Sequence, residues 1–140
     1  MAGIYSLTKK ADAADLQIAA AGTVICDVID ELDGMVALTL SFRLAYGSGG
    51  TTIKAFVQTS LDGGSTWIDI ACIAFTLASA HKLVNLSGLT PKATPVVPTD
   101  GGLADDSCVD GVLGDRLRCK VVSTGVYAGS TVLAVRAAAR

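Results

Sequence analysis

Apolar and polar residues alternate along most of this chain with the period of two that is typical of β-strands. In the clearest run, residues 36–46, every second side chain is large and apolar: Val36, Leu38, Leu40, Phe42, Leu44 and Tyr46. The side chains between them include Thr39, Ser41 and Arg43. This pattern predicts a strand with one face in a core and the other face toward solvent.

Six further short runs have strand character and are separated by glycine-rich breaks: 23–30, 52–60, 67–77, 80–86, 116–121 and 131–136. The run 67–77 is apolar on both faces, which indicates a central strand or a face covered by a neighbouring subunit. Only residues 9–21 are helix-rich in composition, and their apolar spacing suits a strand as well. About eight short strands in 140 residues predict a single all-β domain, an antiparallel β-sandwich of jelly-roll type.

Two segments lie outside this pattern. Residues 1–15 are predicted to be an N-terminal extension of the domain. Residues 88–106 read as a long loop, and loops of this length are often functional. Its turn-forming residues make it the candidate interaction loop: Pro91, Pro95, Pro98, Gly101 and Gly102. We expect deletion of residues 90–104 to leave a folded domain that has lost its partner.

Composition narrows the classes of partner. Hydrophobic residues make up 51% of the chain and charged residues only 17%, with a mean hydropathy of +0.53. Monomers rarely expose large apolar patches, so part of this excess is expected in contacts with other subunits. A net charge of −2 and 5% aromatic residues disfavour nucleic acid as a partner. No apolar run reaches the ~20 residues of a membrane span, and no signal peptide is evident, so we expect synthesis in the cytoplasm.

Candidate chemistry is sparse. The four cysteines are widely spaced, and we expect free thiols rather than disulfides or a zinc site: Cys26, Cys72, Cys108 and Cys119. The single histidine, His81, has no base or nucleophile assigned to it by sequence. The acidic residues around Cys108 match no calcium loop, although an ion there is left open: Asp105, Asp106, Asp110 and Asp115. No catalytic residue, metal or cofactor is predicted.

One motif is specific. Residues 60–67 read S-L-D-G-G-S-T-W, and the pattern resembles the Asp-box of sialidases and related β-proteins. Its characteristic positions are Ser60, Asp62, Gly64, Thr66 and Trp67. An Asp side chain can bond nearby backbone N–H groups, and glycine supplies the backbone freedom of the turn. A propeller needs about 16 strands, which 140 residues cannot supply. We therefore expect a structural hairpin and no catalytic role.

The order of segments resembles a group of small virion proteins of tailed bacteriophages. The resemblance rests on residues 55–60 leading into 62–70, on residues 113–121, and on a closing hairpin at 125–136. It implies a β-sandwich or jelly-roll subunit that is built into the particle without being an enzyme. The implied role is a capsid decoration (cement) protein, a homotrimer that binds the major capsid protein and stabilises the head of the virion.

Two alternatives from other classes remain open. A tail, baseplate or head-fibre accessory protein could act as a carbohydrate-binding module, which needs an exposed aromatic platform. The candidates for that platform are Trp67, Tyr46 and Tyr127. An enzyme would need a convergent polar site, and loss of turnover on substitution of His81 would reveal one.

Overall fold

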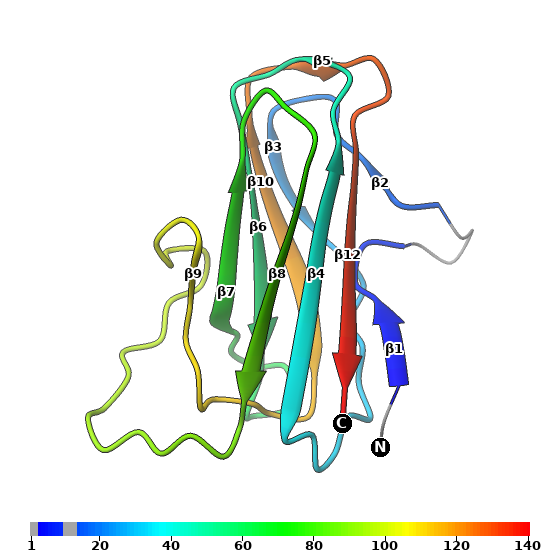
Figure 1. Ribbon diagram of the computed structural model, residues 1–140. Helices are drawn as coiled ribbons and strands as arrows, with labels where there is room; N and C mark the ends of the chain where they lie inside the picture. Colours follow the sequence, from blue (N-terminus) through cyan, green and yellow to red (C-terminus); the bar gives the residue numbers. More distant parts are fainter. Residues whose placement is uncertain (1–2, 10–13) are drawn as a thin grey trace.

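Two antiparallel sheets packed face to face form the domain in a computed structural model, which describes residues 3–9 and 14–140 (Figure 1). The β4 sheet contains β1 (Gly3–Ser6), β2 (Leu16–Gln17), β4 (Ala37–Ala45), β8 (Ala80–Ser87) and β12 (Val132–Ala139). The β6 sheet contains β3 (Gly22–Ile25), β6 (Thr52–Thr59), β7 (Ile68–Phe75), β9 (Ser107–Cys108) and β10 (Leu117–Thr124). A short pair, β5 (Ser48–Gly49) with β11 (Tyr127–Ala128), closes one end. Across the described residues, no helix is long and apolar enough to cross a membrane.

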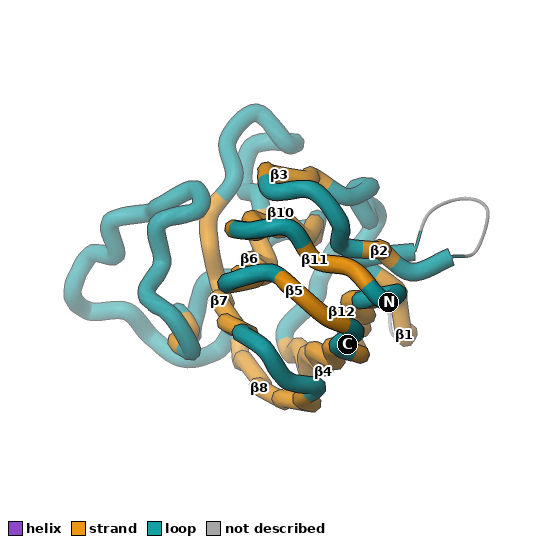
Figure 2. Tube along the Cα trace, turned by 90° about the horizontal axis from the view of Figure 1, so that it is seen from above, coloured by secondary structure: helices purple, strands orange, loops and turns teal. Residues whose placement is uncertain are grey.

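The strand order is that of a jelly roll. The β4 sheet runs β1-β12-β4-β8 and the β6 sheet runs β3-β10-β6-β7-β9, as the end-on view in Figure 2 shows. When the eight strands of four or more described residues are numbered along the chain, the sheets read 1-8-3-6 and 2-7-4-5. This is the double-sheet arrangement made of two Greek keys. The all-β sandwich predicted from the alternating pattern is confirmed.

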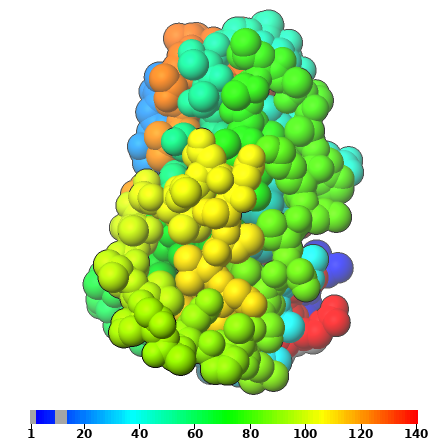
Figure 3. All heavy atoms as spheres, turned by 60° about the vertical axis from the view of Figure 1, so that its left-hand side comes forward, coloured from blue at the N-terminus to red at the C-terminus, as the bar shows by residue number. Residues whose placement is uncertain are grey.

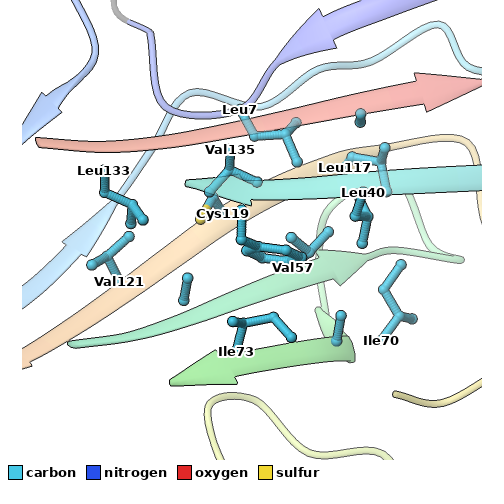
Figure 4. Packing of buried hydrophobic residues seen from close by; sticks show 14 of the residues in the cluster. Leu7, Leu40, Val57, Ile70, Ile73, Leu117, Cys119, Val121, Leu133 and Val135 are labelled. Atoms are coloured by element: carbon cyan, nitrogen blue, oxygen red, sulfur yellow. The ribbon is translucent and has the colours of Figure 1, made fainter. Parts of the chain in front are cut away.

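Side chains from both sheets fill the space between them (Figure 4). Leu40 of β4, Val57 of β6 and Val135 of β12 are all fully buried. The predicted inward face of residues 36–46 is correct from Leu38 to Leu44, whereas Val36 at the strand entrance remains 43% exposed. Burial of each such aliphatic side chain is worth about 1.5–3 kcal/mol, so this core is the main source of stability.

The two outer faces of the sandwich differ. On the β6 sheet, Phe56 and Cys72 point away from the central core and yet are buried. Residues 98–106 lie against this face: Asp100 contacts Gln58 and Asp105 pairs with Lys54. Figure 3 shows the segment between β8 and β9, in yellow-green and yellow, spread over this side of the molecule. The two apolar faces of the run 67–77 are therefore covered by the chain itself.

The N-terminal segment takes part in the fold. β1 pairs with β12 from Gly3↔Ala139 to Ser6↔Arg136, and β2 pairs with the opposite end of β12. Leu7 is buried in the core. The expected extension at residues 1–15 therefore supplies an edge strand, while residues 1, 2 and 10–13 lie outside the described part. The region 9–21, left open between helix and strand, contains β2 in its described portion.

Candidate functional site

The Asp-box hairpin is a closed turn held by its own side chains. The Asp62 carboxylate accepts hydrogen bonds from the Thr66 N–H at 2.8 Å and from the Thr66 hydroxyl at 2.6 Å. The Ser60 hydroxyl donates to Asp62 at 2.9 Å and accepts the Gly64 N–H at 2.9 Å. Gly64 has a φ of 92°, a conformation that favours glycine. The motif therefore closes the connection between β6 and β7.

These hydrogen bonds keep the Asp62 carboxylate ionised. The Thr66 hydroxyl and backbone N–H, followed by the Ser60 hydroxyl, hold the pKa of Asp62 below its usual value. Both carboxylate oxygens are engaged within the hairpin. Asp62 therefore stabilises the turn and is not arranged to bind a ligand. Of the motif residues, Trp67 is the candidate for ligand contact.

The proline- and glycine-containing loop is fixed to the sandwich by a buried carboxylate. Asp69 of β7 is 1% exposed and accepts hydrogen bonds from the Gln58 side chain at 2.8 Å and the Thr99 hydroxyl at 2.8 Å. Three successive backbone N–H groups, those of residues 101–103, donate to it at 2.7, 3.0 and 3.2 Å. Deletion of residues 90–104 would remove four of these five donors. These contacts argue against our expectation that this deletion leaves the domain intact, because a buried polar group that loses most of its hydrogen-bond partners is destabilising.

The acidic residues near Cys108 fix the two ends of this loop separately. Asp110 accepts the Ser87 N–H at 2.6 Å and the Thr90 hydroxyl at 2.9 Å. Asp106 accepts the Ala74 N–H at 3.1 Å and lies 3.3 Å from the Lys82 ammonium. Within the described residues, no three His, Cys, Asp or Glu side chains gather as a metal-ligand group.

The hairpin and the loop meet at a groove beside Trp67. The groove has a volume of about 420 Å³ and is lined by residues 65–68 of the hairpin and residues 98–100 of the loop. The Arg118 guanidinium lies over the Trp67 ring, 4.4 Å from its centroid. Of the predicted loop residues, Pro98 lines the groove, whereas Gly101 and Gly102 bond the Asp69 carboxylate beneath it. Pro91 and Pro95 are exposed and are not among its lining residues.

A polar network connects Asp100, which lines the groove, to the strands of the β6 sheet. Gln58 is fully buried; its amide donates to both Asp69 and Asp100 and accepts from Arg118 at 2.7 Å. Lys120 lies 3.1 Å from the Asp100 carboxylate. The Gln58 hydrogen bond, together with the two cations, holds the pKa of Asp100 below its usual value. Gln58, Asp69 and Asp100 were not among the predicted site residues, although the presence of a polar residue, Asp69, inside the apolar run 67–77 could have indicated one of them.

The other two aromatic candidates are engaged elsewhere. Tyr127 is 1% exposed and its hydroxyl donates to the Thr76 carbonyl at 2.9 Å. Tyr46 packs edge-on against Tyr127, with ring centroids 6.1 Å apart, and its hydroxyl donates to the Gly49 carbonyl. Only Trp67 of the three candidates lies beside a groove.

The outer face of the β4 sheet is open, and its side chains form cross-strand rows that mix small and large residues. One row contains Leu83, Ser41, Arg136 and Ser6, and the row beside it contains His81, Arg43 and Ala134. Leu83 and Ile4 of this face are 64% and 80% exposed. Arg136 is neutralised by Asp15, with two hydrogen bonds of 2.9 Å. The face therefore carries few unpaired charges, and a hollow of about 260 Å³ lies on it, lined by Ser41, Arg43, His81, Ala134 and Arg136.

This face brings His81 next to a hydroxyl. His81 Nε2 lies 2.8 Å from Ser41 Oγ, and Arg43 lies 3.4 Å from His81 Nδ1. Because a guanidinium can only donate, a hydrogen bond from Arg43 requires the tautomer in which Nδ1 accepts and Nε2–H donates to the serine. A general base needs the opposite arrangement, in which a carboxylate holds Nδ1–H and Nε2 accepts the serine proton. In the tautomer that a hydrogen bond from Arg43 requires, His81 is not arranged to activate the Ser41 hydroxyl as a nucleophile.

The thiols are poorly suited to nucleophilic chemistry. Burial, followed by the nearby Asp105 charge, raises the pKa of Cys72 to about 11. A hydrogen bond with Cys26 and burial raise the pKa of Cys119 well above its usual value. Burial also raises the pKa of Cys108. Because the thiolate is the reactive form, these three cysteines are mostly protonated at neutral pH and are weak nucleophiles. No disulfide joins the four cysteines.

No known family model matches the chain, and no curated protein matches it significantly in sequence.

Proposed function

We propose that this protein is a non-enzymatic structural subunit of a bacteriophage particle, a capsid decoration (cement) protein. It assembles as a homotrimer and binds the major capsid protein lattice on the head of the virion. The observation that carries the proposal is the jelly-roll strand order with one outer face covered and the other open. Jelly rolls are a common architecture of capsid proteins. The resemblance of residues 55–70 and 113–136 to small tailed-phage virion proteins points the same way.

The open face of the β4 sheet supplies the contact surface in this proposal. Small side chains let another backbone approach closely, and Leu83 and Ile4 supply apolar anchors. Apolar anchors surrounded by weaker contacts are the usual source of interface energy. Many copies on a lattice then add up modest single-site affinities. The low charge and high mean hydropathy of the chain suit a subunit that recognises its partner by surface shape and not by charged groups.

Substitution of the exposed Leu83 on this face tests the proposal. We expect Leu83→Lys to reduce the self-associated mass measured by light scattering and to reduce co-sedimentation with capsid shells at least tenfold. Val126→Lys is the matched control, because Val126 is 70% exposed in the turn between β10 and β11, outside both the β4 sheet and the candidate interaction loop. Equal behaviour of the two variants would reject the β4 face as the contact surface. A wild-type protein that is monomeric and ignores shells would reject the proposed function.

One observation favours a second function. The groove beside Trp67 supports a carbohydrate-binding module of a tail, baseplate or head-fibre accessory protein. Since the groove lies on the opposite side of the sandwich from the β4 face, the two functions are compatible and can be tested separately.

A further inference from the structure

We propose that the groove between the Asp-box hairpin and the loop is a binding site for a neutral oligosaccharide. Its volume of about 420 Å³ lies within the range of about 300–1,000 Å³ that is usual for small-molecule sites. The site is built from segments some thirty residues apart in sequence, and the buried Asp69 holds them in register. This assignment does not depend on the proposed virion function.

One side of the groove offers an apolar surface of the right kind. Trp67 of the hairpin and Pro98 of the loop both line the groove. The C–H faces of pyranose rings pack against aromatic rings, where they gain both burial and weak C–H contacts. Arg118 lies over the indole and restricts its orientation. The aromatic surface is therefore pre-organised, which lowers the cost of binding.

Polar groups of the groove that have no partner among the described residues can form hydrogen bonds with sugar hydroxyls. No described residue accepts the Trp67 indole N–H or engages the Ser65 hydroxyl. The Asp100 Oδ1 atom accepts from Gln58 at 2.6 Å and from Lys120 at 3.1 Å, whereas Oδ2 has no described donor. A sugar hydroxyl can both donate and accept, so it can bond Asp100 Oδ2 while another accepts the indole N–H. The groove thus presents a donor, an acceptor and a hydroxyl around one apolar wall.

The charge balance selects neutral sugars. The cations Arg118 and Lys120 both lie beside the carboxylate of Asp100, which lines the groove. Both cations lie within 3.8 Å of the Asp100 carboxylate. An acidic sugar would place its charge beside Asp100 Oδ2 without a free cation to pair with. We therefore expect sialylated or uronic-acid oligosaccharides to bind more weakly than neutral ones.

Trp67 is the single tryptophan of the chain, so its fluorescence reports directly on this groove. The experiment titrates the full-length protein with neutral trisaccharides of glucose, galactose, mannose and N-acetylglucosamine, and with sialyllactose. We expect a saturable change in emission for at least one neutral trisaccharide and a weaker response to sialyllactose. Asp100→Asn should weaken that binding about tenfold, the loss of one charge-assisted hydrogen bond. The control Asp33→Asn, at an exposed position outside the groove, should bind like wild type.

A second, more conservative variant tests the site without removing its aromatic side chain. Trp67→Phe keeps an aromatic surface but loses the indole N–H, and calorimetry should show reduced yet measurable saccharide binding. Urea unfolding of each variant checks that the domain remains folded. Absence of any saturable response to the neutral panel would overturn the proposal. A response to sialyllactose alone, or emission changes produced only by capsid shells, would overturn it as well. Loss of shell binding in Leu83→Lys leaves this result unaffected, so the two proposals fail separately.

Discussion

Replacement of Asp69 tests the central structural element of the site, the buried carboxylate that fixes the loop. Asp69→Ala removes the acceptor of five hydrogen bonds. A hydrogen bond to a charged group contributes about 1.5–3 kcal/mol, but this value cannot be multiplied by five. Thr99 and the N–H groups of residues 101–103 are not fully buried and regain water once the loop loosens. Gln58, which is fully buried, loses one acceptor without solvent access.

The expected cost of Asp69→Ala is therefore about 2–4 kcal/mol, because the hydrogen bonds to the carboxyl group are lost and the buried Gln58 amide has one acceptor fewer. Asp69→Asn keeps the shape but turns an amide N–H₂ toward the donors, and we expect about 2–3 kcal/mol. Urea unfolding measures both, with Asp33→Asn as an exposed control within about 0.5 kcal/mol of wild type. Amide hydrogen exchange should speed up at residues 101–103 and stay slow in β12. A loss below about 1 kcal/mol for Asp69→Ala, or unchanged exchange in the loop, would refute this reasoning.

Three further outcomes follow from the structure. The pKa values of Asp15 and Asp100 are lowered in the folded state, so these groups add stability that is present above their unfolded pKa near 4 and is lost as the pH falls through their lower folded values. Acid titration followed by circular dichroism should show this loss of stability, and the loss should be smaller in Asp15→Asn. Gly114→Ala should destabilise by about 1–3 kcal/mol in thermal melts, because its Cβ would meet the Ser60 carbonyl, whereas Gly102→Ala has space for a Cβ. Alkylation at pH 7 followed by mass spectrometry should modify the exposed Cys108 well before Cys72 or Cys119, and equal labelling would contradict the assigned burial.

The sandwich was predictable because its signal is local. The alternation at residues 36–46 and the Gly-rich turns determine which faces are apolar, and β4 and β6 begin and end within one residue of the expected limits. β1 was missed because its four residues contain little pattern, and its pairing with residues 136–139 spans the whole chain. A pairing of that separation leaves no trace in a window of neighbouring residues.

The site was predictable only in part. The Asp-box is a local motif, so the hairpin and the position of Trp67 could be anticipated. The groove depends on hydrogen bonds between Asp69 and residues 99–103. Composition alone indicated a long loop and did not show that it is attached to the sheet. The small side chains of the β4 face, such as Ser41 and Ala134, suit either solvent or a partner. Which outer face is covered follows from long-range contacts that sequence patterns do not encode.

The most direct test of the proposed virion role is co-sedimentation of the purified protein with shells assembled from the major capsid protein of its particle, combined with its mass in solution. We expect a trimer that pellets with shells at a fixed, saturable ratio to the capsid protein. A monomer that stays in the supernatant at every protein concentration would contradict it.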